Sequence, residues 1–124
     1  MAEKLSAEQT QRIEQIQQFI KTVEHVQGLV AQLEANRNQA KSADTICHSI
    51  ARELSQLRHR AVAANVSVIA DVAGAMSVLA TRAGNLNMKI RTLTDGVNNL
   101  KAQLDHALTA ALRPERKGPE QPRP

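Results

Sequence analysis

The stretch LNMKIRTLTDGVNNLKAQLDHALTAA, residues 86–111, decides the fold that the sequence predicts. Along one side of this stretch, apolar residues recur at spacings of alternately four and three, without interruption. They are Leu86, Ile90, Leu93, Val97, Leu100, Leu104, Ala107 and Ala111. β-Branched residues alternating with leucines along such a seam favour two-stranded packing of helices. The stretch therefore predicts a helix that needs a partner helix. We call the first six residues of this series, from Leu86 to Leu104, the association seam.

Composition limits the shape and the chemistry of the molecule. The chain has 124 residues and a formal net charge of +4, which leaves room for one domain. It has no tryptophan or tyrosine, and Phe19 is its one aromatic residue. Aromatic side chains normally supply much of a globular core and most pocket walls. We therefore expect an elongated helical protein rather than a compact enzyme.

A first helix is predicted over residues 6–35. Ser6 and Gln9 have the spacing of a capping box, in which each side chain accepts a backbone N–H of the other residue. The predicted apolar stripe is Ile13, Ile16, Ile20, Val23, Val26, Val30 and Leu33. The spacing of three at Val23 and Val26 follows another spacing of three, which is typical of a stammer that overwinds a coil locally.

Residues 34–45 separate this helix from the next one. Their apolar side chains are all alanines, and the asparagines, serine, aspartate and threonine among them favour caps and turns. We interpret them as a turn, while a continuous helix stays open because the segment contains no proline or glycine. The second helix is predicted over 43–83, with Ser42 or Asp44 as its N-cap and Gly84 and Asn85 as its stop.

A third helix is predicted over 86–112. The fold class is therefore all-α: an elongated antiparallel helical hairpin or three-helix coiled-coil bundle, forming a single domain over 1–112. Residues 113–124 contain all four prolines together with charged residues, and no large apolar group. Such a segment cannot compensate the entropy cost of ordering, so a disordered tail is expected.

Residues 61–81 allow two interpretations, because they carry one charge, Asp71, in 21 residues, about the length that crosses a bilayer. On a continuous helix one wide apolar face results, which either packs against protein or faces lipid. Its residues are Val62, Val66, Ile69, Val72, Met76 and Leu79. A charge at the bilayer centre costs at least about 2.5 kcal/mol. We favour protein contacts and keep a membrane or lipid-surface role as the alternative.

Metal binding and catalysis are both disfavoured. Asp44, Cys47 and His48 share a helix face and could offer ligands to zinc, but no further pair completes a shell. Neighbours in a helix point about 100° apart, so Cys47 and His48 do not form a catalytic dyad. The glycines stand singly and form no phosphate loop. We expect no enzyme activity, no metal and no cofactor.

Arg52, Arg58 and Arg60 form a basic cluster that could contact a polyanion. The chain lacks the aromatic residues that stack on bases, so weak, non-specific nucleic-acid binding is the third hypothesis, and an exposed charged face is the simpler explanation.

The function expected from the sequence is therefore non-enzymatic protein–protein association, as a scaffold, adaptor or small subunit of a larger assembly. The partner would be a second copy of the chain or another helical protein. Its identity, the stoichiometry and the pathway are not encoded in any motif. A single cysteine and first residues without an apolar signal region lead us to expect a cytoplasmic location.

Overall fold

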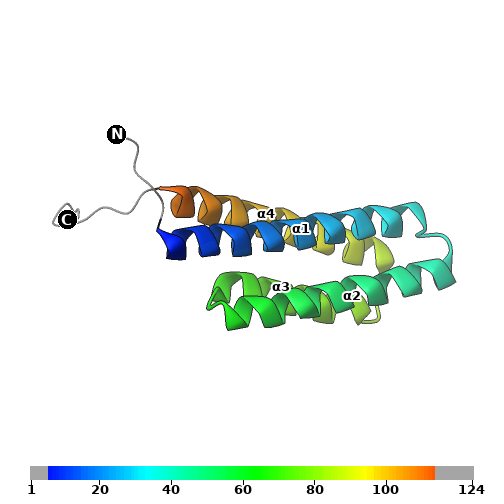
Figure 1. Ribbon diagram of the computed structural model, residues 1–124. Helices are drawn as coiled ribbons and strands as arrows, with labels where there is room; N and C mark the ends of the chain where they lie inside the picture. Colours follow the sequence, from blue (N-terminus) through cyan, green and yellow to red (C-terminus); the bar gives the residue numbers. More distant parts are fainter. Residues whose placement is uncertain (1–5, 114–124) are drawn as a thin grey trace, which may run out of the picture.

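The computed structural model describes residues 6–113, which form four helices: α1 (Ala7–Ala35), α2 (Ala40–Ala63), α3 (Ser67–Thr81) and α4 (Leu86–Leu112). Consecutive helices run in opposite directions, giving an up-down-up-down bundle (Figure 1). The predicted all-α helical bundle is therefore confirmed. The third helix predicted over 86–112 corresponds to α4.

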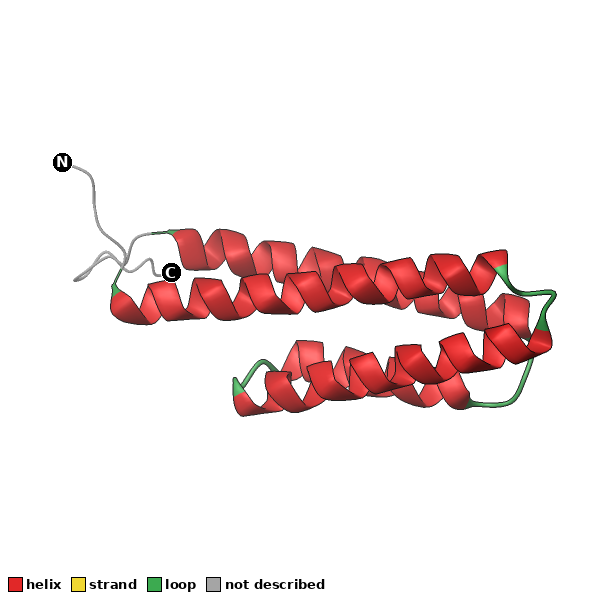
Figure 2. Cartoon of the chain, turned by 45° about the vertical axis from the view of Figure 1, so that its right-hand side comes forward, coloured by secondary structure: helices red, strands yellow, loops and turns green. Residues whose placement is uncertain are grey.

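The bundle has two layers, one made by α1 and α4 and the other by α2 and α3 (Figure 2). Each helix packs against its neighbours in the chain, and α4 closes the bundle by returning to α1. The N-terminal end of α1 and the C-terminal end of α4 lie together and extend past the turn between α2 and α3 (Figure 1). There the Gln9 amide donates a hydrogen bond of 2.6 Å to the Arg113 carbonyl.

The prediction of one long helix over 43–83 is wrong, because residues 64–66 form a turn. Asn65 adopts a left-handed conformation with φ of 63°. The N–H of Val66 donates to the Ala61 carbonyl at 2.8 Å, and that of Asn65 to the Val62 carbonyl at 3.0 Å. This pattern is a Schellman motif, for which asparagine is the usual substitute for glycine. The chain reverses there, and α2 and α3 become a hairpin of ordinary length.

The connection between α1 and α2 is a turn, as favoured above, but it is shorter than residues 34–45. α2 begins at Ala40 with Gln39 as its N-cap, and the Gln39 side chain makes no capping bond. Ser42 and Asp44 therefore lie inside the helix, and their assignment as N-caps is wrong. Lysine and alanine in this segment are good helix formers, which explains the earlier start.

The capping box of Ser6 and Gln9 is confirmed, with hydrogen bonds of 2.8 and 3.0 Å. The predicted stripe of α1 needs one correction, since Phe19 is buried and Ile20 only partly so. With Phe19 in the seam, the spacing alternates between three and four from Ile16 to Leu33. The two consecutive spacings of three therefore lie at Ile13, Ile16 and Phe19, and not at Ile20, Val23 and Val26 as predicted.

The start of α4 is also defined by local chemistry. The Asn85 side chain accepts a hydrogen bond from the Met88 N–H at 3.0 Å and so caps α4. Gly84 has φ of 149°, a conformation that other residues rarely adopt. Gly84 and Asn85 thus belong to the connection into α4, and α3 ends at Thr81. The tail predicted to be disordered lies, apart from Arg113, outside the described residues.

Candidate functional site

The association seam of α4 packs inside the bundle. Leu93 and Leu100 are fully buried, Val97 and Leu104 nearly so, and Ile90 is 7% exposed, while Leu86 is partly buried. Their neighbours are α1 and α3 of the same chain. The seam thus has the helical partner that its spacing predicts, and that partner is intramolecular. The expectation that this seam itself requires a second chain is corrected accordingly.

The face predicted for residues 61–81 is divided by the turn at Asn65. Ile69 and Met76 are buried on the inner side of α3, and Val66, Val72 and Leu79 are partly buried. Val62 lies on α2 and is 55% exposed, so its assignment to a common buried face is wrong.

The side of α3 that points away from the bundle is also apolar. Val68 is 49% exposed and Val78 is 56% exposed, and Ala75 between them is exposed as well. At 100° per residue these three side chains lie within about 80° of one another on the helix. Val72 and Leu79 border them on the side nearer α4. We call Val68, Asp71, Ala75, Val78 and Arg82, at the C-cap, the outer stripe of α3.

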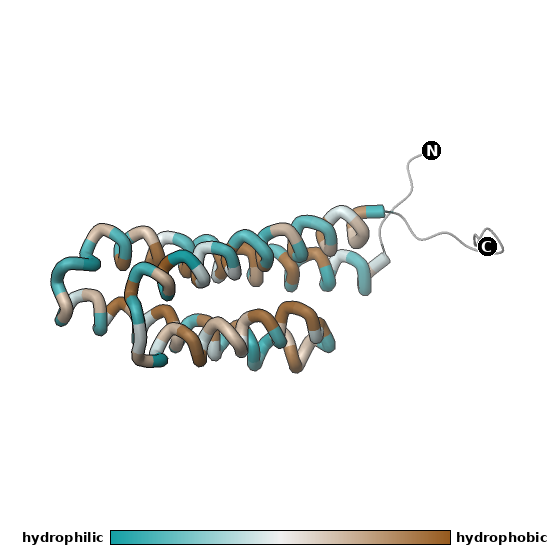
Figure 3. Tube along the Cα trace, turned by 180° about the vertical axis from the view of Figure 1, so that it is seen from behind, coloured by the Kyte–Doolittle hydropathy of each residue, from teal (hydrophilic) through white to brown (hydrophobic). Residues whose placement is uncertain are grey.

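The inner side of α3 is formed mostly by small residues, while Val68 and Val78 lie on its outer side. Three of its five buried residues are alanines, which let α3 approach its neighbours closely. A Cβ placed at Gly74 would lie 2.9 Å from Cδ of Arg58, and one at Gly96 would lie 2.6 Å from Sδ of Met76. α3 is thus held between α2 and α4 by small residues. Figure 3 shows hydrophobic residues recurring along this lower pair of helices.

Two charges accompany the outer stripe, Asp71 near the N-terminal end of α3 and Arg82 at its C-cap. Both are exposed. The one contact of ion-pair type within residues 6–113 joins His48 to Asp44 at 3.7 Å, so neither Asp71 nor Arg82 has a charged partner in the described chain. The outer stripe therefore combines uncovered apolar groups with two unpaired opposite charges.

Within residues 6–113, no helix is both long and apolar enough to span a membrane. The turn at Asn65 is the physical reason, since it divides the apolar stretch. α3 alone has 15 residues and a length of about 22 Å, against about 30 Å for the hydrocarbon core of a bilayer.

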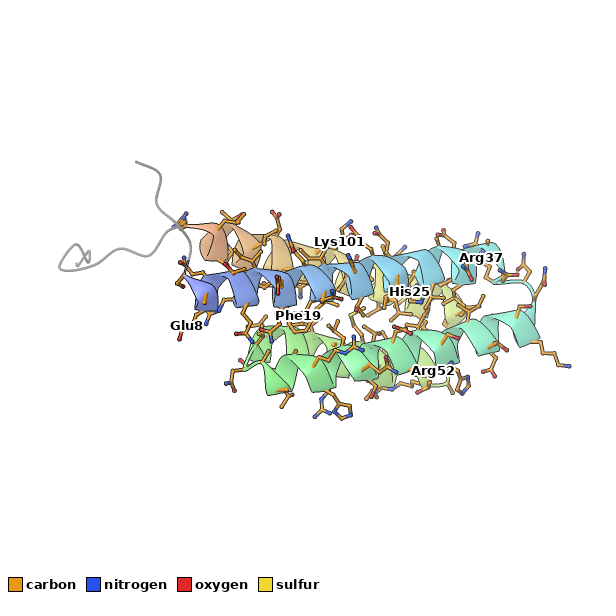
Figure 4. The ribbon with its side chains drawn as sticks, in the orientation of Figure 1. Glu8, Phe19, His25, Arg37, Arg52 and Lys101 are labelled. Atoms are coloured by element: carbon orange, nitrogen blue, oxygen red, sulfur yellow. The ribbon has the colours of Figure 1, made fainter. Side chains whose placement is uncertain are left out.

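The three arginines of the basic cluster are exposed on α2 but do not share one face. Arg58 and Arg60 are two residues apart and therefore point about 160° away from each other. Arg52 is directed away from the bundle (Figure 4), and the side chain of Arg58 lies over Gly74 of α3. The structure does not bring these cations together into a single patch.

Asp44, Cys47 and His48 do not converge on a common point. Cys47 is buried, whereas the His48 ring is exposed and lies 2.9 Å from the Asp44 carbonyl oxygen. No group of three or more potential ligands in residues 6–113 is arranged to hold a metal ion. Burial raises the pKa of the Cys47 thiol, Lys89 opposes this shift, and Asp44 adds to it. A thiol with a raised pKa is a weak nucleophile at neutral pH.

A shallow groove of about 350 Å³ lies between α1 and α4 and is lined by Ile20, Val23, Lys101, Ala102, Leu104 and Asp105. Lys101 lies on the outer side of α4 (Figure 4), and its Nζ donates a hydrogen bond of 3.3 Å to Oε1 of Gln27 on α1. Polar groups do not converge inside this groove, as they do in sites for small ligands.

Comparison of the chain with protein-family models, curated proteins and solved structures found no match. Function is therefore inferred from the chemistry of the chain's own surface. The sequence pattern does not predict the outer stripe of α3, because it predicts residues 61–81 as part of one helix with one apolar face. Asn65, between an alanine pair and a Val-Ser-Val run, is the signal that could have revealed the turn.

Proposed function

We propose that the protein is a non-enzymatic helical bundle that acts by protein–protein association, as a scaffold, adaptor or small subunit of a larger assembly. The outer stripe of α3 is the surface through which it associates. The observation that carries the proposal is the exposure of Val68 and Val78 on a helix whose opposite side is already buried. Burying such side chains removes apolar surface from water, which is the main driving force of association.

The distribution of charge supports the same surface. α1, α2 and α4 carry charged side chains along their exposed sides, whereas α3 carries Asp71 alone within its 15 residues. Charged residues are depleted at the centre of protein interfaces and frequent elsewhere on surfaces. α3 is therefore the helix whose outer side has the composition of an interface.

Association is also favoured over catalysis because the described residues contain no group with a pKa shifted toward reactivity. Among residues 6–113, Cys47 is the group whose pKa shift is resolved, and the shift makes the thiol less reactive. Catalytic sites normally combine a shifted pKa with a cleft and a second functional group. Cys47 lies in the bundle interior, away from the groove between α1 and α4.

The test compares two valines of equal exposure. Val78→Lys changes the outer stripe, and Val62→Lys changes an exposed valine on α2 that is outside it. The wild-type protein is expected to elute from an extract of its own cells in an assembly larger than its 13.5 kDa monomer. Val78→Lys should release the monomer, and Val62→Lys should not. Elution of the wild type as a monomer, or equal behaviour of both variants, contradicts the proposal.

A further inference from the structure

We infer that the outer stripe of α3 binds the same stripe of a second copy of this chain, with the two α3 helices antiparallel. This inference rests on the proposed function and specifies its partner. It follows from the spacing, the charges and the sizes of the residues along the stripe.

Four of the five residues of the outer stripe are spaced symmetrically. Asp71, Ala75, Val78 and Arg82 follow one another at intervals of four, three and four residues. Read in the opposite direction, the intervals are the same. Two antiparallel copies can therefore be aligned so that each of these four residues faces one of the four in the second copy, while Val68 lies beyond them. In a two-fold dimer each such contact occurs twice, because the same patch serves both subunits.

The charges of the stripe are complementary in this alignment. Asp71 faces Arg82 of the second copy, and Arg82 faces Asp71 of that copy. Both side chains are exposed and lack a charged partner within the described chain. In a parallel dimer, by contrast, each charge would face its own kind, which is unfavourable. The charges therefore select the antiparallel arrangement.

The central residues of the stripe are complementary in size. Ala75 faces Val78 of the second copy in both central layers, so that a small residue receives a larger one. This lets the helices approach closely, and packing of this kind is what fills an interface to the density of a protein interior. Val68 lies one turn beyond Asp71 and, at 49% exposure, extends the apolar contact past the charged pair.

The remaining charges around α3 do not compete for the same positions. The Arg58 side chain lies against Gly74, on the α2 side of the stripe, and does not form an ion pair with Asp71. Lys89 belongs to the first turns of α4, near Cys47. Asp71 and Arg82 are therefore available to a second copy without breaking a contact within the bundle.

The experiment uses charge reversal in the purified full-length chain, measured by sedimentation equilibrium at low salt. Asp71→Arg places two cations face to face at both ends of the dimer, and Arg82→Asp does the same with two anions. Each variant alone is expected to raise the dimer Kd at least about tenfold. An equimolar mixture of the two variants restores both attractive contacts, so it should dimerise within about threefold of the wild type. Raised salt should reduce these differences.

Matched controls separate the stripe from a general effect of net charge. Asp95→Arg and Arg91→Asp make the same charge changes at exposed positions of α4. They should leave the dimer Kd and the mixing behaviour at wild-type values. Circular dichroism should show wild-type helix content in every variant, because each substituted side chain is exposed.

Wild-type protein that remains monomeric at all concentrations overturns this inference, as does a dimer that the reversals at positions 71 and 82 do not weaken. Neither result decides the proposed function, which is judged by the Val78 and Val62 variants in extract. Flotation of monomeric wild type with vesicles of phosphatidylglycerol and phosphatidylcholine, abolished by Val78→Lys, would identify lipid as the occupant and also overturn the inference. Dimerisation lost in each single variant and regained in their mixture supports it.

Discussion

α3 and α4 are neighbours in the bundle but differ in what their two sides carry. α4 buries isoleucine, valine and three leucines on its inner side. Its outer side is mostly charged and polar, and its exposed large apolar side chains, Met88 and Leu112, lie at its two ends. α3 buries mostly alanines and leaves Val68 and Val78 exposed. An uninterrupted heptad seam is therefore no sign of association between chains when the same chain supplies the partner. The apolar side that the bundle leaves exposed is the better indication of where a second chain would bind.

The largest expected effect is on the inner side of α4. Leu100→Asp removes a fully buried leucine and introduces a carboxylate without a partner. Loss of the leucine packing alone costs about 2–5 kcal/mol, and the buried charge adds to this. We expect the free energy of unfolding to fall by at least about 3 kcal/mol, enough to unfold a marginal bundle.

Urea denaturation followed by circular dichroism measures this effect. Asn99→Asp introduces the same carboxylate at the adjacent exposed position, and it should change stability by less than about 0.5 kcal/mol. Equal tolerance of both substitutions would mean that the inner side of α4 is not packed against α1 and α3.

A smaller effect is expected where α3 meets α4. Gly96→Ala places a Cβ 2.6 Å from Sδ and 2.9 Å from Cγ of the buried Met76, so the methionine must move. Overpacking costs about 1–3 kcal/mol, and the better helix propensity of alanine recovers up to about 1. With the full recovery, a net loss of up to about 2 kcal/mol is predicted.

The matched control for this contact is Gly28→Ala on α1, where nothing lies within 4 Å of the new Cβ. It should stabilise the bundle by about 0.5–1 kcal/mol. Thermal melts of the two variants should shift in opposite directions, and a shift of the same sign in both would refute the close contact of α3 with α4.

The turn between α2 and α3 depends on the left-handed conformation of Asn65. Asn65→Ala forces an alanine into the left-handed conformation at φ of 63° and should destabilise the bundle by about 1–2 kcal/mol. Asn65→Gly tolerates the same conformation and should be nearly neutral. Chemical denaturation distinguishes them. If Asn65→Ala were the more stable protein, α2 and α3 would be better described as one helix.

The smallest effect concerns Cys47, at the end of the bundle that α3 does not reach. Burial holds the pKa of this thiol above its ordinary value, so the folded state favours the neutral form. The corresponding stabilisation is present at neutral pH and is lost as the pH rises above about 8.5, the ordinary pKa of a cysteine. Compared with Cys47→Ala, the wild type should lose stability more steeply above that pH, and Ellman's reagent should label Cys47 slowly at pH 7. Rapid labelling of folded protein would contradict its burial.

Helix existence was predictable wherever the apolar period was regular. Leu93, Val97 and Leu100 alone define the buried side of α4, and the capping box at Ser6 defines the start of α1. The turn at Asn65 was not predicted, because its neighbours are apolar and helix-compatible and the left-handed conformation depends on a single asparagine. The spacing of the apolar residues in α1 is compatible with either Phe19 or Ile20 as the buried residue. Packing against the layer of α2 and α3 buries Phe19 (Figure 4).

The candidate site was less predictable than the fold. Sequence reasoning found Ile69 and Met76 and the unusual apolarity of residues 61–81. It could not find the outer stripe. The valines of that stripe are exposed because α2 and α3 form a hairpin in which the alanines of α3 are buried. Which of two apolar sides a helix buries depends on the close approach of its neighbours, here at Gly74 and Gly96.

We propose that copies of this chain meet through α3 and not through α4, and crosslinking tests this most directly. In a Cys47→Ala background, chains with Ala75→Cys are mixed with tagged chains with Val78→Cys and treated with a short bismaleimide. The control mixes Asp95→Cys with Asn98→Cys, which have the same three-residue spacing on the exposed side of α4. Abundant mixed dimers are expected from the α3 pair and background levels from the α4 pair. Equal yields from both pairs, or mixed dimers from the α4 pair alone, would contradict it.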